Sequence, residues 1–186
     1  GWQWGGGWLA ELGFSDFAGS TLVHSTGGAA ALAGIILLGA RNGRFDSAGN
    51  PKALKPFAAS SIPLVTIGVF ILWLGWFGFN GGSQLALGTF DDAVAISSIF
   101  INTNLAACGG VMAAGIITRL MYGKTDVIQM LNGAIGGLVA ITAEPLAPSP
   151  FAAILIGAVG GLIVVFGTKL LFNFKLDDVV GCLLYT

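Results

Sequence analysis

The chain has 186 residues, of which 55% are hydrophobic and only 9% are charged. A soluble domain carries about 25% charged residues, so this composition excludes a surface covered by water and indicates residence in a bilayer. The net charge of −1 gives no indication of a polyanionic partner, so we expect no nucleic acid. Thirty glycines are typical of membrane helices, where small residues let neighbouring helices approach closely.

Five apolar runs follow one another along the chain, each near the ~20 residues needed to cross about 30 Å of hydrocarbon. We predict a helix in each, because backbone polar groups in lipid must be satisfied within the segment. The predicted spans are about 16–40, 57–82, 92–119, 127–143 and 150–172. The sequence therefore predicts an all-α, polytopic transmembrane bundle over residues 1–186, with a sixth helix beginning after Asp177 and Asp178.

The basic residues fall only in alternate loops of this arrangement. They are Arg41, Arg44, Lys52, Lys55, Arg119, Lys124, Lys169 and Lys175. The intervening loops carry Asp91, Asp92 and Glu144 and no base. Strict alternation of the spans puts every Lys and Arg on one side of the membrane, and the positive-inside rule predicts that this side is cytoplasmic.

Two ionisable residues of the first span are candidates for function. His24, the only histidine, lies eight residues after Asp16, so we expect it about 12 Å below the outer end of a helix. An ionisable side chain there is costly and usually faces a cavity or a partner. A neutral imidazole both donates and accepts hydrogen bonds, which suits a small polar solute or a proton relay. The alternative is a histidine that only joins two helices. Asp16 opens the span, either as an N-cap or as a carboxylate that attracts cations.

Aromatic residues crowd the outer half of the second span, with a hydroxyl just beyond them. They are Trp73, Trp76, Phe77 and Phe79, followed by Ser83. Aromatic faces attract cations, best with Trp, and rings can also close a narrow pore. The alternative is helix packing plus an interfacial aromatic belt.

Two glycine-rich stretches, at 109–115 and 132–137, predict faces where helices pack closely. Cys108 and Cys182 show no metal-ligand spacing. The sequence contains no nucleophile with a matching base, so we expect neither an enzyme nor a cofactor.

Four stretches resemble the ammonium transporter (Amt/Mep/Rhesus) family. They are DFAGSTLVHSTGGAAAL at 16–32, WFGFNGGS at 76–83, MLNGAIGGLVAITA at 130–143 and LDDVVG at 176–181. That family folds as eleven helices in two inverted halves and assembles as a homotrimer with one pore per subunit. The resemblance implies that this chain is a fragment carrying about helices five to nine and the start of helix ten. It also implies transport of ammonium or ammonia across the cell membrane.

The resemblance implies roles for residues of the outer mouth. Trp4 matches the aromatic residue of a cation vestibule, Ser83 its hydroxyl, and Trp76 a second aromatic near the same mouth. Asp16 matches the acidic residue that organises the vestibule from below. Ammonium would be recruited there by cation–π and hydrogen-bond contacts.

Further residues match the family's pore. His24 matches the first of two pore histidines, Phe79 one of two gating phenylalanines, and Thr142 lies where a pore-proximal threonine is found. Ammonium would lose its proton on entering the dry pore, because a buried ion costs far more than neutral ammonia. Ammonia would then pass His24.

The chain departs from the family at its end. The second pore histidine should lie eight residues after Asp178, at the position of Thr186, and GCLLYT does not resemble the family's continuation. We therefore expect the fragment to be inactive alone, whereas its full-length parent transports ammonium. The alternatives are an ammonium-sensing module coupled to a cytoplasmic signalling domain, and a membrane protein with a degenerate pore. Expected partners are ammonium or ammonia, membrane lipid, identical subunits and a cytoplasmic regulator.

Overall fold

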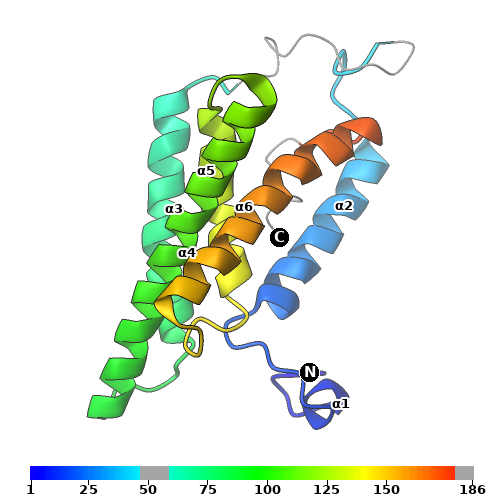
Figure 1. Ribbon diagram of the computed structural model, residues 1–186. Helices are drawn as coiled ribbons and strands as arrows, with labels where there is room; N and C mark the ends of the chain where they lie inside the picture. Colours follow the sequence, from blue (N-terminus) through cyan, green and yellow to red (C-terminus); the bar gives the residue numbers. More distant parts are fainter. Residues whose placement is uncertain (47–58, 179–186) are drawn as a thin grey trace.

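The structure is a computed structural model that describes residues 1–46 and 59–178 (Figure 1). The regular elements in these residues are all helices. They are α1 (Trp8–Glu11), the π-helix η1 (Ser20–Ser25), α2 (Thr26–Leu38), α3 (Ile62–Gly82), α4 (Phe90–Tyr122), α5 (Val127–Ile141) and α6 (Pro150–Asn173). Lys52, Lys55, Phe57, Cys182 and Thr186 lie outside the described residues.

Four helical segments of the described part are long and apolar enough to cross a membrane. They are Ser20–Leu38, Ile62–Gly82, Phe90–Tyr122 and Pro150–Asn173. The predicted all-α, polytopic membrane bundle is therefore confirmed. The predicted span 127–143 corresponds to α5, which has 15 residues and is shorter than a helix that crosses the full hydrocarbon layer.

Capping residues explain where the helices begin and end. Helix α4 starts at Phe90, two residues before the predicted span, because Thr89 and Asp92 form a capping box. It runs to Tyr122 and stops at Gly123, whose φ of +72° is a left-handed conformation that glycine adopts without strain. The first span begins at Ser20 instead of residue 16, because the preceding residues form a tight corner.

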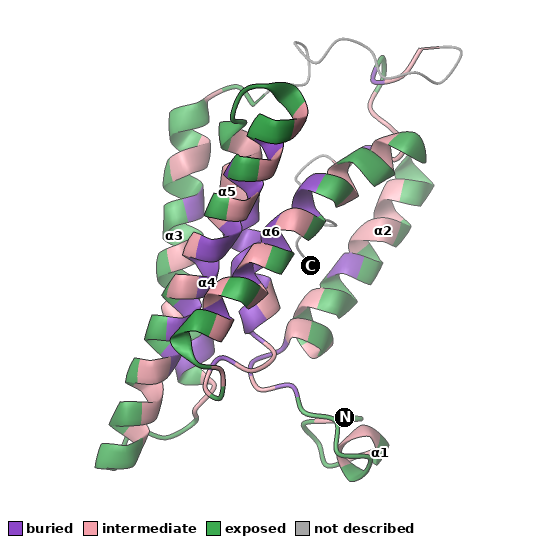
Figure 2. Cartoon of the chain, in the orientation of Figure 1, coloured by how far each residue is buried: buried purple, intermediate pink, exposed green. Residues whose placement is uncertain are grey.

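The core lies where α4, α5 and α6 meet (Figure 2), and glycines bring their backbones into direct contact. A Cβ atom at Gly110 of α4 would collide with the carbonyl of Gly133 in α5. One at Gly157 of α6 would collide with the carbonyl of Ala106. These contacts bear out the predicted packing faces, since close backbone approach is what small residues allow in a membrane. By contrast, Gly28 is the one buried residue of α2.

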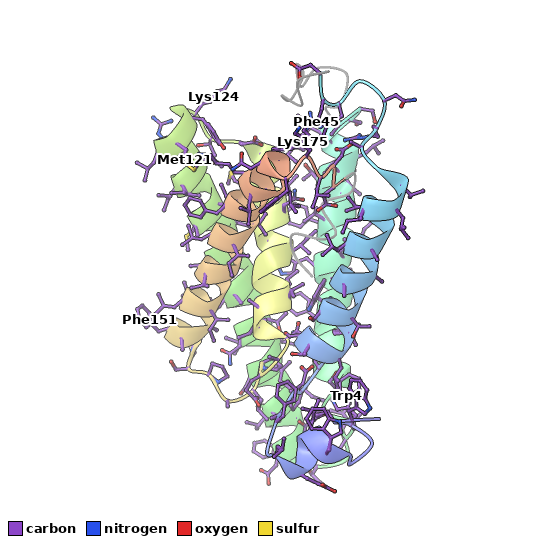
Figure 3. The ribbon with its side chains drawn as sticks, turned by 90° about the vertical axis from the view of Figure 1, so that its right-hand side faces the viewer. Trp4, Phe45, Met121, Lys124, Phe151 and Lys175 are labelled. Atoms are coloured by element: carbon purple, nitrogen blue, oxygen red, sulfur yellow. The ribbon has the colours of Figure 1, made fainter. Side chains whose placement is uncertain are left out.

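Six basic residues of the described part gather at one end of the bundle, where α2, α4 and α6 end. They are Arg41, Arg44, Arg119, Lys124, Lys169 and Lys175. Figure 3 shows Lys124 and Lys175 at this end and Trp4 at the other. The structure thus places the basic residues that it describes at one end of the bundle, as the alternation of the loops predicted. We call the two ends the basic end and the tryptophan end.

An ion pair at the basic end joins the segments that follow α2 and α6. Asp177 is 2% exposed, and its carboxylate accepts hydrogen bonds from Arg41 Nε at 2.7 Å and Arg41 Nη2 at 2.9 Å. Arg44 Nε lies 3.3 Å from the same carboxylate. The hydrogen bond from Arg41 lowers the pKa of Asp177 below its ordinary value, against the opposing effect of burial.

Candidate functional site

A buried carboxylate organises the chain at the tryptophan end. Asp16 is 2% exposed, and its Oδ1 accepts a hydrogen bond from the Gly19 amide at 3.0 Å. Its Oδ2 accepts from the amides of Thr21 and Leu22, both at 2.9 Å. The carboxylate therefore satisfies amides that would be orphaned at the start of η1. This is the capping role that the sequence suggested, although the N-cap position itself is Gly19.

Gly19 makes the corner between Asp16 and the helix. Its φ of +113° lies in a region that residues with a Cβ rarely adopt. An added methyl group would also stand 2.6 Å from the side chain of Val23 and 3.2 Å from the ring of Trp4. The corner therefore requires glycine, and it sets the direction in which η1 leaves.

Trp4 packs on this corner. Its indole Nε1 donates a hydrogen bond to the backbone carbonyl of Asp16 at 2.7 Å, while 57% of the residue remains exposed. The structure thus brings together Trp4 and Asp16, which lie 12 residues apart in the chain. An anchored indole with an open face is suited to contact a cation arriving from solvent.

His24 belongs to the wide turn of η1. The amides of Val23 and His24 both donate to the carbonyl of Gly19, each at 3.0 Å, and the bond from His24 has the i→i+5 spacing of a π-helix. Helical geometry begins at Ser20, so His24 lies about 6 Å below the helix start at 1.5 Å per residue. Our predicted depth of about 12 Å was too great, because the residues from Asp16 to Gly19 are not helical.

Two aromatic rings from α3 hold the imidazole. The rings of His24 and Trp76 are stacked, with centroids 5.0 Å apart and planes at 9°. Phe79 lies 5.6 Å from His24 at 53° and 5.8 Å from Trp76. The Nε2 atom of His24 is buried and has no hydrogen-bond partner in the part of the chain that the structure describes.

Trp76, which we predicted near the mouth with Trp4, is 9% exposed and stacks on His24. Its Nε1 donates a hydrogen bond to Thr142 Oγ1 at 2.8 Å. Thr142, at the end of α5, is fully buried, and therefore fixes the plane of the indole on which His24 stacks.

A chain of buried hydrogen bonds continues behind Thr142. Its Oγ1 lies 2.7 Å from the Leu138 carbonyl and 3.2 Å from Asn80 Oδ1, and Asn80 Nδ2 donates to Thr103 Oγ1 at 3.0 Å. Asn80 and Thr103 are fully buried. Thr103 was not predicted from the sequence, because a threonine inside an apolar span carries no signal until its partner on α3 is known.

Ser83 caps the tryptophan end of α3. Its Oγ donates a hydrogen bond to the carbonyl of Phe79 at 2.8 Å, which leaves the oxygen lone pairs available to accept another. Phe79 is 39% exposed and contacts His24 from the adjacent turn. The described contacts connect Ser83 to the site through Phe79 and do not join it to Trp4.

The fold is that of a polytopic helical membrane protein in which a half-buried histidine stacks against aromatic rings of a neighbouring helix. Residues 1–184 match the family model described as the Ammonium Transporter Family. The ammonium transporter Amt2 of Archaeoglobus fulgidus is 45% identical over 192 residues, which cover 98% of this chain and 40% of that protein. This chain belongs to the ammonium transporter family.

Solved structures support the same assignment. A structure titled Sensor Amt Protein is 36% identical, with a TM-score of 0.89 over 96% of this chain and 42% of its own length. The crystal structure of Candida albicans Mep2 is 33% identical, with a TM-score of 0.85 over 99% of this chain and 39% of its own length. The chain therefore spans about two fifths of the length of the relatives that it matches.

Proposed function

We propose that this chain forms part of the conduction pathway of an ammonium transporter, about helices five to nine and the start of ten. The observation that carries the proposal is the imidazole of His24, stacked on Trp76 with an unbonded, buried Nε2. A buried nitrogen with no partner is costly, and a passing ammonia molecule supplies the missing hydrogen bond. Thr142 and Asn80 keep the Trp76 wall in place.

The proposal divides the remaining site residues between recruitment and gating. Trp4, with its open indole face anchored by Asp16, attracts ammonium through cation–π contact, and Ser83 accepts a hydrogen bond from it. Phe79 covers the approach to His24, so that the ion sheds its proton before it enters the apolar part of the path. Neutral ammonia then moves past the imidazole.

The orientation follows from charge. We propose that the basic end faces the cytoplasm, since Lys and Arg near helix ends are retained on that side. The tryptophan end is then the outer entrance. The proposed full-length assembly is a homotrimer in the cell membrane that takes up ammonium without acting as an enzyme, and a cytoplasmic regulator would meet it at the basic end.

Methylammonium uptake by cells expressing the full-length protein tests this function. We expect His24→Ala to abolish saturable uptake, because the path loses its polar group and its stacked ring. Ser25→Ala is the matched control, since Ser25 is an exposed neighbour on the same helix. Unchanged uptake by the His24 variant at equal membrane abundance contradicts the proposed pathway and favours a degenerate pore.

A second candidate, an ammonium-sensing module, is favoured by the likeness to the Sensor Amt Protein. In a sensor the same mouth would bind ammonium and the helices would signal to a cytoplasmic domain. The two functions differ in a direct measurement. Wild-type full-length protein that binds methylammonium but gives no uptake above empty cells supports the sensor over the transporter.

A further inference from the structure

A pocket at the basic end lies apart from the histidine site. It has a volume of about 540 Å³ and opens between the α4–α5 connection, the first turn of α5 and the last turns of α6. Its lining residues are Tyr122, Lys124, Thr125, Asp126, Gln129, Thr168, Lys169 and Phe172. We call it the lysine pocket. None of these residues takes part in the proposed conduction pathway.

The depth of the lysine pocket is that of lipid headgroups. Helix α6 has 24 residues and is about 36 Å long, which exceeds the ~30 Å hydrocarbon layer. Its last turn therefore emerges among the headgroups; Phe172 lies in that turn and Lys169 directly precedes it. Tyr122 is the last residue of α4. Aromatic rings with polar neighbours are typical of this interfacial layer.

The charge of the pocket favours an anion. Lys124 and Lys169 both line it, and within residues 1–46 and 59–178 no salt bridge engages either ammonium group. Asp126 also lines the pocket and reduces the net charge of these three side chains to about +1. Its Oδ1 accepts hydrogen bonds from the amides of Ile128 at 2.9 Å and Gln129 at 3.2 Å, capping α5.

The walls combine polar and apolar surface. Gln129 Nε2 donates a hydrogen bond to Thr168 Oγ1 at 3.3 Å, which ties α5 to α6 across the pocket floor. The ring of Phe172 and the aliphatic stems of the lysines add apolar surface beside the charges. A soluble anion uses only the charges, whereas a phospholipid presents a phosphate and hydrocarbon together.

We propose that the lysine pocket binds the headgroup phosphate of an anionic phospholipid in the leaflet on the basic side. Lys124 and Lys169 bind the phosphate as two point charges from different segments. The hydroxyl groups of Tyr122 and Thr125 lie beside it as donors. The lipid thereby bridges the α4–α5 connection to the end of α6.

Lipid titration of the full-length protein in detergent tests this proposal. The probes are short-chain phosphatidylglycerol, phosphatidylcholine with matched acyl chains, and inorganic phosphate. We expect phosphatidylglycerol to bind most tightly, and Lys124→Gln or Lys169→Gln each to weaken its binding about fivefold, as expected for one lysine near an anionic lipid. The double variant should bind the two lipids alike.

Lys175→Gln is the matched control, because it removes the same charge from the same end but does not line the pocket. An equal loss of affinity in this variant would show a general attraction of the basic end and overturn the proposal. Equal affinity of the wild type for both lipids would also overturn it. Competition by inorganic phosphate at concentrations that match the lipid would assign the pocket to free anions instead.

Discussion

The hydroxyl of Thr142 offers the sharpest test of the site's construction. Thr142→Val keeps the shape of the side chain and removes the group that accepts the 2.8 Å hydrogen bond from Trp76 Nε1. Both residues are buried, so the indole N–H loses its partner and water does not replace it. Leaving a buried donor unsatisfied costs about 1–3 kcal/mol. We expect the free energy of unfolding to fall by this amount.

The measurement is denaturant unfolding of the full-length protein in detergent, as a double-mutant cycle with Trp76→Phe. In the Trp76→Phe background the donor is absent, so Thr142→Val should cost less, with a coupling energy of about 0.5–3 kcal/mol. Thr66→Val serves as control, because among residues 1–46 and 59–178 the Thr66 hydroxyl bonds only the Ile62 carbonyl of its own helix. It should change stability little.

Thr142→Val should also slow methylammonium uptake, because the Trp76 ring loses its hydrogen bond, tilts and no longer stacks on His24. A coupling energy near zero would refute the inference that Thr142 holds the indole. So would a loss of stability equal to that of Thr66→Val.

Two further predictions concern packing and charge. Gly110→Ala should separate α4 from α5, since its Cβ meets the Gly133 carbonyl, and should lower stability in detergent by about 1–3 kcal/mol. Gly115→Ala is the control and should be tolerated, because its Cβ lies 3.4 Å from a flexible methionine. Equal melting temperatures of the two variants would contradict the packing argument. The lowered pKa of Asp177 means that its pairing with Arg41 stabilises the protein fully above about pH 3.9 and is lost as pH falls through the lower native pKa. Asp177→Asn should therefore be less stable than wild type at neutral pH, and acid titration should narrow the difference; a constant difference from pH 6 to pH 2 would count against the ion pair.

Much of the bundle could be predicted from the sequence because lipid leaves few alternatives. Apolar length locates the helices, and the restriction of bases to alternate loops separates the two ends. Local capping was harder to read. Asp16 was recognisable as a cap, but its three amide partners depend on the left-handed conformation of Gly19, which no periodicity reports. The helix therefore begins four residues later than predicted.

Site residues that belong to a sequence motif could be predicted. The positions of side chains that depend on contacts between helices could not. His24 was identifiable as the one ionisable side chain deep in its span. Trp76 was assigned to the mouth by the resemblance, whereas its hydrogen bond to Thr142 on α5 could not be predicted from either helix alone. The hydrogen bond between Asn80 and Thr103 joins α3 to α4, and the spacing of the two residues in the sequence does not predict it.

The π-turn of η1 makes the spacing between Asp16 and His24 as consequential as the residues themselves. An ordinary α-turn over the same residues, at about 100° per residue, would point the imidazole in another direction, because Asp16 fixes the start of the helix. An insertion or deletion before His24 that the π-turn does not absorb would therefore carry the imidazole away from Trp76. Insertions and deletions in this short stretch should therefore be strongly counterselected, even where individual side chains vary.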